Sequence, residues 1–255
     1  MSTSARPVFD AHLHIIDPGF PLTENNGYLP PAFTAEDYLR RTDPLGITGG
    51  AVVSGSFQGF DQDYLVEALR RLGTGFVGVT QLPVTVTDEE ITRLDAHGVR
   101  AVRFNVRRGG SETLDHLEAL ARHVHEVAGW HTELYIDAAD LPDLMPVLRA
   151  LPAVSVDHLG LTESGLPHLL SFVERGGRVK ATGFGRVDLE VTKAVQAVVA
   201  ADPRALMFGT DLPSTRARRP FDDDDLRLLT DTIGPEHVRA VLHDNAAAFY
   251  FHHRD

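Results

Sequence analysis

Two histidines separated by one residue occur near the start of the chain, in the segment Val8-Phe-Asp-Ala-His-Leu-His-Ile. Alternation along a β-strand would place Asp10, His12 and His14 on one face. Residues two apart on a strand have Cα atoms about 6.6 Å apart, so both imidazoles can reach one metal ion or one substrate oxygen. A lone buried histidine is usually a hydrogen-bonded core residue, but an acid and two histidines on one face favour chemistry.

His158 and Asp211 each follow a short apolar segment farther along the chain. Taken alone, His158 could be a core histidine, and Asp211 could cap a turn because aspartate favours such positions. Taken with His12 and His14, they form a set of nitrogen and oxygen ligands that suits one divalent metal, Zn²⁺ or Mn²⁺. The same set is a carboxylate base beside proton donors, which suits hydrolysis without a metal.

Elements that could bring these residues together follow from the hydrophobic pattern. Short apolar segments alternate with longer amphipathic ones throughout, which is typical of βα units and a parallel sheet. The predicted strands are Val8–Ile15, Gly50–Ser56, Phe76–Leu82, Val99–Val106, His131–Asp137, Val154–Gly160, Arg178–Gly183 and Ala205–Thr210. Eight such units in 255 residues predict an α/β fold, a single (β/α)₈ TIM-barrel domain over residues 1–255. A doubly wound sheet is less favoured because it usually has fewer strands.

Two connections, Ile16–Phe33 and Leu212–Asp223, are longer than a strand-to-helix turn requires. Active sites of this barrel lie at the carboxyl ends of the strands, where both connections would emerge, so we expect both to act as lids. The second connection contains Arg216, Arg218 and Arg219. The simplest interpretation is a solvated cluster, although one of these arginines could reach an anionic substrate.

Composition excludes several classes of function. The chain has 24 lysines and arginines against 36 aspartates and glutamates, and its formal net charge of −12 disfavours binding to nucleic acids and anionic membranes. It has no cysteine, which excludes disulfides and thiolate metal sites. No apolar run approaches the roughly 18 residues of a membrane span. We therefore expect a soluble, cytoplasmic protein that acts on a small molecule, with homo-oligomer formation left open.

Five motifs occur in order, each at a different predicted strand. They are Asp10-Ala-His-Leu-His, Arg103-Phe-Asn, Val156-Asp-His-Leu-Gly, Val179-Lys-Ala-Thr-Gly and Phe208-Gly-Thr-Asp-Leu-Pro. Together they resemble the amidohydrolase superfamily, in the branch that contains dicarboxylate and sugar-lactone lactonases. The resemblance covers essentially the whole chain, and it implies a (β/α)₈ barrel and hydrolytic activity.

The resemblance also implies roles for individual residues. Asp211 would be the general base that activates water, and His12, His14 and His158 would surround the reacting carbonyl group. Asp10 would hold these groups in orientation without contacting the substrate itself.

The predicted fifth strand departs from the pattern of the resembled family. Metal sites of that family usually add a lysine or histidine at the carboxyl end of this strand. Here His131 lies at the opposite end, and Tyr135 lies near the expected mouth. One divalent metal held by the three histidines and Asp211, or catalysis without a metal, are therefore equally consistent with the sequence.

Substrate recognition is expected from polar residues at the same end of the barrel. Arg103 and Asn105 share a face of the fourth predicted strand, and Arg103 is either a carboxylate binder or part of a structural ion pair. Tyr135 is either a hydrogen-bond donor to substrate or a wall residue. Arg186 and Gln58 are further candidates, with helix capping as the alternative for Gln58.

These observations predict a hydrolase that opens a cyclic ester bearing carboxylate or hydroxyl groups. One alternative is a metal-dependent, non-oxidative decarboxylase of the same superfamily. The other is a barrel that binds a small acid without turnover, since a fold does not fix a function.

Overall fold

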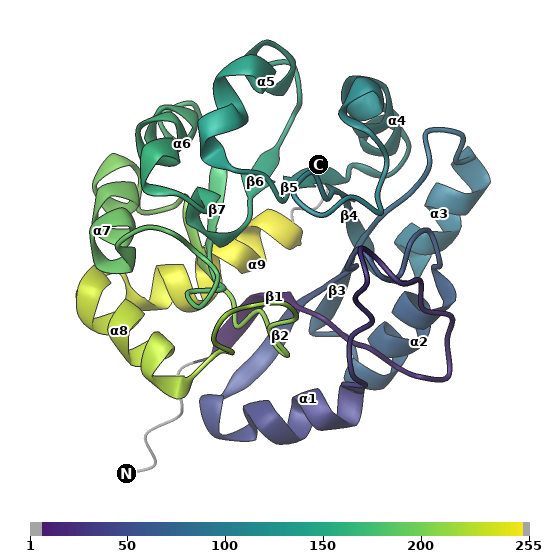
Figure 1. Cartoon of the computed structure of the whole chain (residues 1–255), viewed down its shortest axis with the longest axis horizontal. Helices are drawn as coiled ribbons and strands as arrows, with labels where there is room; N and C mark the ends of the chain where they lie inside the picture. Colours follow the sequence, from purple (N-terminus) through teal and green to yellow (C-terminus); the bar gives the residue numbers. More distant parts are fainter. Residues whose placement is uncertain (1–6, 252–255) are drawn as a thin grey trace.

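The structure, a computed structural model, describes residues 7–251. Figure 1 shows a ring of strands enclosed by helices, and the eight strands are parallel and adjacent in chain order. The strands are β1 (Val8–Leu13), β2 (Ile47–Val53), β3 (Phe76–Thr80), β4 (Val99–Phe104), β5 (His131–Leu134), β6 (Val154–Val156), β7 (Arg178–Ala181) and β8 (Leu206–Phe208). The predicted (β/α)₈ barrel is confirmed.

The barrel closes between β1 and the residues that follow β8. The Asp211 N–H donates to the His12 carbonyl at 2.7 Å, and the His14 N–H donates to the Leu212 carbonyl at 2.8 Å. Closure therefore takes place at the level of the candidate catalytic residues and holds Asp211 beside the two histidines.

Helices form the outer layer of the molecule (Figure 1). They are α1 (Ala35–Thr42), α2 (Asp63–Leu72), α3 (Asp88–Ala96), α4 (Leu117–Ala128), α5 (Leu141–Leu148), α6 (Leu166–Val173), α7 (Val191–Ala201), α8 (Asp223–Ile233) and α9 (Asn245–Tyr250). Local sequence explains their limits: Thr34 caps α1 with a reciprocal capping box, and Gly73, at φ +90°, ends α2.

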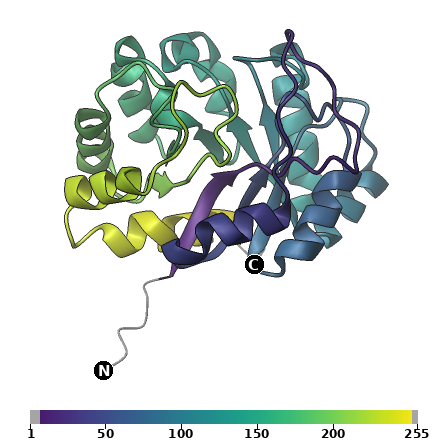
Figure 2. The ribbon, with the colours of Figure 1, turned by 60° about the horizontal axis from the view of Figure 1, so that its bottom comes forward.

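Helix α9 covers the amino-terminal end of the barrel. In Figure 2 this yellow helix lies beside the purple strand β1. Its Tyr250 ring stacks on Phe9, with the ring centroids 5.5 Å apart, and Ala246 packs in the same cluster. Apolar side chains therefore fill the interior of the barrel near this end, below the candidate catalytic residues.

The first strand contains an irregularity that the sequence pattern did not predict. Its register against β2 shifts between Asp10 and Leu13, so strict alternation is lost. The Asp10 carboxylate faces away from the two imidazole rings and accepts hydrogen bonds from the His12 backbone N–H at 3.1 Å, from the Tyr38 hydroxyl at 3.0 Å and from Thr210. The prediction that Asp10 shares a face with His12 and His14 is wrong, because the bulge lets His12 and His14 point inward while Asp10 does not.

Two strands end earlier than predicted, and the candidate residues lie in the turns that follow. β6 ends at Val156, so His158 begins a short 3₁₀ turn, and β8 ends at Phe208, before Asp211. His158 has φ +51° and Asp211 has φ +60°, a left-handed conformation that is uncommon for residues with a side chain. Such conformations gather at functional sites because surrounding contacts must enforce them.

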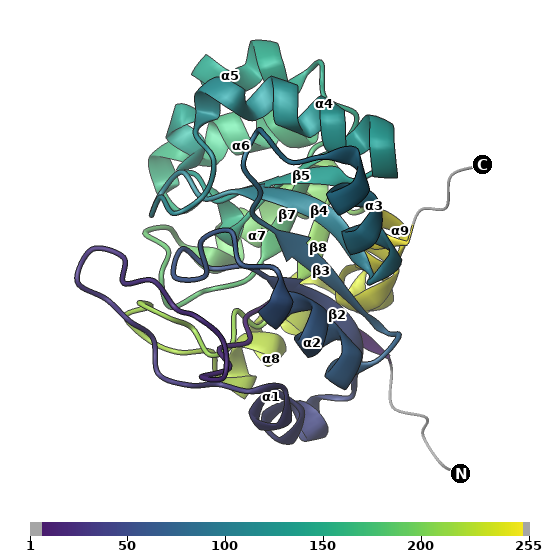
Figure 3. The ribbon, with the colours of Figure 1, turned by 90° about the vertical axis from the view of Figure 1, so that its right-hand side faces the viewer.

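The two long connections lie on the same side of the molecule, as predicted. Figure 3 shows the loop that follows β1 next to the loop that follows β8. The Arg216 guanidinium of the second loop donates a hydrogen bond to the Asn25 carbonyl of the first and lies 4.5 Å from the Tyr28 ring centroid. Both loops therefore meet over the carboxyl end of the barrel.

Candidate active site

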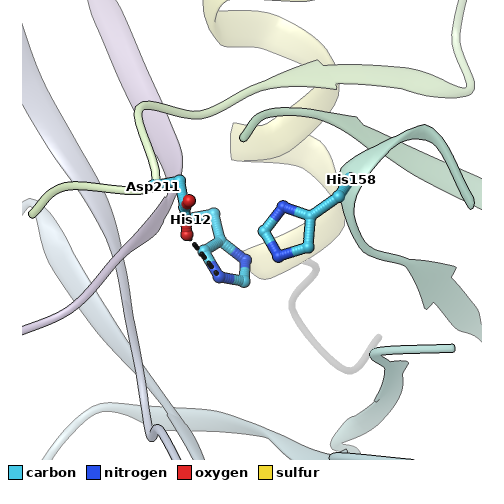
Figure 4. A group of neighbouring side chains, drawn as sticks. All are labelled: His12, His158 and Asp211. Carbon is cyan, nitrogen blue, oxygen red and sulfur yellow. Dashed lines mark ion pairs between the residues drawn. The ribbon is translucent and has the colours of Figure 1, made fainter. Parts of the chain in front are cut away.

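His12, His158 and Asp211 point toward one another at the carboxyl end of the barrel (Figure 4). One potential ligand atom from each lies within 4.8 Å of the others, and all three residues are buried. The His14 Nε2 lies 3.5 Å from Asp211 Oδ1, and the His12 Nε2 lies 3.8 Å from it. The structure thus brings together all four residues that the sequence predicted as catalytic.

A hydrogen bond fixes the tautomer of His14, and a neighbouring carboxylate favours one tautomer of His12. The His14 Nδ1 lies 2.7 Å from the Val53 carbonyl, which can only accept, so this nitrogen carries a proton. The His12 Nδ1 faces the Asp157 carboxylate at 3.3 Å. Burial lowers the pKa of His12 to about 3, although Asp157 opposes the shift. His12 is therefore neutral, with its proton toward Asp157 and its Nε2 lone pair toward the site.

Asp211 is held in one orientation by Arg186. The Arg186 Nε donates to Asp211 Oδ2 at 2.9 Å, and its Nη2 donates to the same oxygen. Burial raises the pKa of the Asp211 carboxyl, but the charge of Arg186, supported by His158, outweighs burial and holds this pKa well below its ordinary value. Asp211 is therefore ionised, and Oδ1, which has no hydrogen-bond donor among residues 7–251, faces the histidines.

A buried layer of charges beneath the histidines holds His12 in place. Asp157 Oδ2 accepts from the Arg103 Nε at 3.1 Å and Nη2 at 2.8 Å, and Lys180 Nζ lies 3.5 Å from Asp157 Oδ1. Lys180 also pairs with Glu133, which accepts a hydrogen bond from the Tyr250 hydroxyl at 2.5 Å. Burial raises the pKa of Asp157, but its interactions with His12, Lys180 and Arg103 together lower it well below its ordinary value.

A small pocket opens above this centre. Its lining includes four of the predicted substrate-binding residues: Arg103, Asn105, Tyr135 and Arg186. Its free volume is about 30 Å³, so this structure leaves room for about one water molecule there. Gln58 does not line this pocket; its amide instead bonds the Gly55 N–H at 2.6 Å and the Ile15 carbonyl at 2.7 Å.

Comparison with known proteins places the chain in a family. A family model described as amidohydrolase matches residues 9–251. The chain belongs to the amidohydrolase family. It is 31% identical to a 2-pyrone-4,6-dicarboxylate hydrolase of Comamonas testosteroni, in an alignment that covers 95% of this chain and 89% of the relative. It is 29% identical to a 4-sulfomuconolactone hydrolase of Rhizobium radiobacter, over 95% of this chain and 89% of that protein.

Solved structures share the fold of this amidohydrolase. A protein of Agrobacterium tumefaciens superposes with a TM-score of 0.84 at 23% identity and covers 96% of both chains. A structure from Acinetobacter baumannii, described as a probable 2-pyrone-4,6-dicarboxylic acid hydrolase with citric acid bound, gives a TM-score of 0.82 at 21% identity, over 95% of this chain and 98% of that one. At these identities the structures support the barrel fold alone.

The donor set of the amidohydrolase fits a divalent metal by atom type. The Nε2 of His12 and Oδ1 of Asp211 have no hydrogen-bond partner within residues 7–251, and both face the same point. Lone pairs that converge in a buried site need a cation or a proton donor between them. The local charge disfavours a divalent metal, because Arg186 already neutralises Asp211. Water or a substrate group can fill the same position.

Sequence reasoning missed several polar residues of this site. Asp157 and Glu133 are buried acids in or next to predicted strands. The sequence did carry a signal for them, because acids are almost never fully buried without a partner. Arg108 and Ser56 also line the pocket, but they come from irregular loops, where the sequence carries no periodic signal.

Two guanidinium groups at the mouth of this amidohydrolase pocket have no acidic partner. Arg108 and Arg216 both line it, and within the described residues neither forms an ion pair with a carboxylate. Burial and the charge of Arg108 lower the pKa of Arg216. Two like charges held close together without a counterion are typical of a site for an anion.

The described helices include none long and apolar enough to cross a membrane.

Proposed function

We propose that this amidohydrolase hydrolyses a small lactone that carries at least one anionic group. The observation that carries the proposal is the free oxygen of Asp211, which faces three histidines below a pocket with two uncompensated guanidinium groups. Two relatives are named as hydrolases of lactones bearing acidic groups, which supports the same class of substrate here.

In the proposed reaction, Asp211 Oδ1 accepts a proton from water as the water oxygen attacks the lactone carbonyl. The ring C–O bond then breaks, and the proton passes from Asp211 to the departing ring oxygen. The product carries a hydroxyl group, or its keto form, and a new carboxylic acid, which loses its proton to solvent and becomes a carboxylate. Arg186 keeps Oδ2 occupied, so Oδ1 is the oxygen that faces the water.

Tyr135 and His158 are the groups that we expect to stabilise the developing oxyanion. The Tyr135 hydroxyl oxygen accepts from Arg186 Nη1 at 3.4 Å, which leaves the hydroxyl proton for the substrate. The guanidinium carbons of Arg103 and Arg186 lie 5.2 and 6.0 Å from the centroid of the Tyr135 ring. His158 lies against the same ring and can donate from one nitrogen as a neutral imidazole.

If a metal binds, His12, His158 and Asp211 would hold it, with His14 beside them, and it would supply Lewis-acid polarisation of the carbonyl. We expect wild-type activity to survive exhaustive chelation, because the Arg186 charge opposes a dication at Asp211. Elemental analysis before and after chelation, with parallel assays, measures this. The Arg186→Gln variant should bind zinc more tightly than wild type. Stoichiometric zinc in wild type, with activity lost on its removal, would refute the expectation, make the histidines and Asp211 metal ligands and keep the decarboxylase alternative open.

The arginines at the mouth should control substrate affinity. Arg108→Gln and Arg216→Gln are each expected to raise KM by about tenfold or more with little change in kcat, because each removes a charged contact made equally in ground and transition states. Steady-state kinetics measures this. Arg218→Gln is the matched control, since Arg218 lies on the same loop but pairs with Asp188 in solvent. An equal effect of the control would contradict this assignment.

A panel of lactones tests the function itself. Carboxylated or sulfonated lactones and their neutral methyl esters are incubated with the enzyme, and ring-opened product and carbon dioxide are both measured. We expect ring opening of the anionic lactones and a lower kcat/KM for the esters. Carbon dioxide release without ring opening would support a decarboxylase. Tight binding of the acids without any product would support a non-catalytic barrel.

A further inference from the structure

A second, larger cavity lies at the amino-terminal end of the barrel, opposite the candidate active site. Its volume is about 780 Å³, within the range of small-molecule sites. Several strands contribute to it at or near their first residues: Arg100 in β4, His131 in β5, Arg178 in β7 and Arg204 just before β8. The cavity therefore collects three guanidinium groups in a protein whose formal net charge is −12.

Two of these arginines form ion pairs, and the third shares the acid of one of them. Arg100 pairs with Asp95 at 3.0 Å, and Arg204 pairs with Asp202 at 3.0 Å. Arg178 makes one hydrogen bond within residues 7–251, to the Gly176 carbonyl at 3.3 Å. Burial lowers the pKa of Arg178, Asp202 raises it, and the charge of Arg204 acts in the same direction as burial. Two guanidinium groups therefore face one carboxylate, Asp202, which leaves a local excess of positive charge.

The remaining walls of the cavity indicate what kind of anion fits. Val127, Ala128 and Pro152 form an apolar side, and the Phe249 and His131 rings contact each other with centroids 4.0 Å apart and planes inclined at 45°. A bare inorganic ion would leave this surface in contact with water. An organic acid with a flat apolar body would cover the apolar wall and place its carboxylate at Arg178.

We propose that this cavity is a second ligand site, which binds a small carboxylic acid with a flat apolar body through Arg178 and Arg204. Polar residues at this end of a (β/α)₈ barrel usually serve stability, and the ion pair of Arg100 fits that role. The ligand-sized volume and the two arginines that share one carboxylate instead indicate a binding site. The site is independent of the lactone-hydrolase proposal, because it shares no lining residue with the pocket above Asp211.

Calorimetric titration with benzoate tests the proposal, with benzamide as the neutral analogue. Saturable benzoate binding is expected, weakened about tenfold or more in Arg178→Gln and for benzamide, because each change removes the charged contact. Arg175→Gln is the matched control, since Arg175 is exposed three residues earlier and bonds Ser171. Arg186→Gln controls for the active site. We expect both controls to bind benzoate like wild type.

Two results would overturn the proposal. Absence of saturable binding is the first, and benzoate binding that is lost in Arg186→Gln but kept in Arg178→Gln is the second.

Discussion

The Asp211→Asn variant is expected to lower kcat for lactone hydrolysis by about 10²–10⁴-fold, because an amide cannot accept the proton of the attacking water. KM should change little, since the anion-binding arginines remain in place. Steady-state kinetics on a lactone identified by the panel provides the measurement. Asp188→Asn is the control, because Asp188 is an exposed carboxylate that pairs with Arg218. Retention of more than about a tenth of wild-type kcat would contradict a general-base role.

The same variant leaves Arg186 partly without its counterion, so loss of activity must be separated from loss of structure. The Arg186 side chain is 7% exposed and donates twice to Asp211. Removing one partner of a buried pair is destabilising. A melting curve of each variant and the double variant Asp211→Asn with Arg186→Gln address this. The double variant should recover stability and stay inactive if Asp211 is the base.

Lys180→Met is expected to lower the free energy of unfolding by about 3–5 kcal/mol, the usual cost of removing one member of a buried ion pair. Lys180 is fully buried between Glu133 and Asp157, so its loss leaves two buried carboxylates undercompensated. The chain has one other lysine, Lys193, which pairs with Glu163 in solvent. Lys193→Met is therefore the matched control and should change stability little.

Denaturant unfolding followed by the fluorescence of Trp130, the single tryptophan, measures both lysine variants. Adding Glu133→Gln to Lys180→Met removes one uncompensated carboxylate and should restore part of the lost stability. Equal losses in the two single variants would show that the buried network contributes nothing beyond an exposed pair.

The sequence predicted the barrel because its signal is repetitive. Eight apolar segments with amphipathic stretches between them define the fold even when several strand ends are misplaced. His12, His14, His158 and Asp211 could be found because strand order alone places their positions at one end of the barrel. That prediction required no knowledge of any individual side-chain contact.

What failed depends on local register and on pairing across the barrel. Asp10 was assigned to the wrong face because one irregularity in β1 reverses the alternation after it. The Arg103–Asp157 pair joins residues 54 positions apart, on β4 and just after β6, and no local pattern encodes it. Gln58 was predicted to bind substrate, but both ends of its amide are used by backbone groups of neighbouring loops. Whether Arg103 also contacts substrate stays a prediction.

The central claim is that an anionic lactone reacts between Asp211 and the three histidines. Determining a crystal structure of Asp211→Asn with an unreacted carboxylated lactone tests it most directly. The account predicts the lactone carbonyl beside His158 and Tyr135, a water within about 3–3.5 Å of its carbon, and the substrate anion at Arg108 and Arg216. A lactone bound elsewhere, or bound with its carbonyl turned away from residue 211, would contradict it.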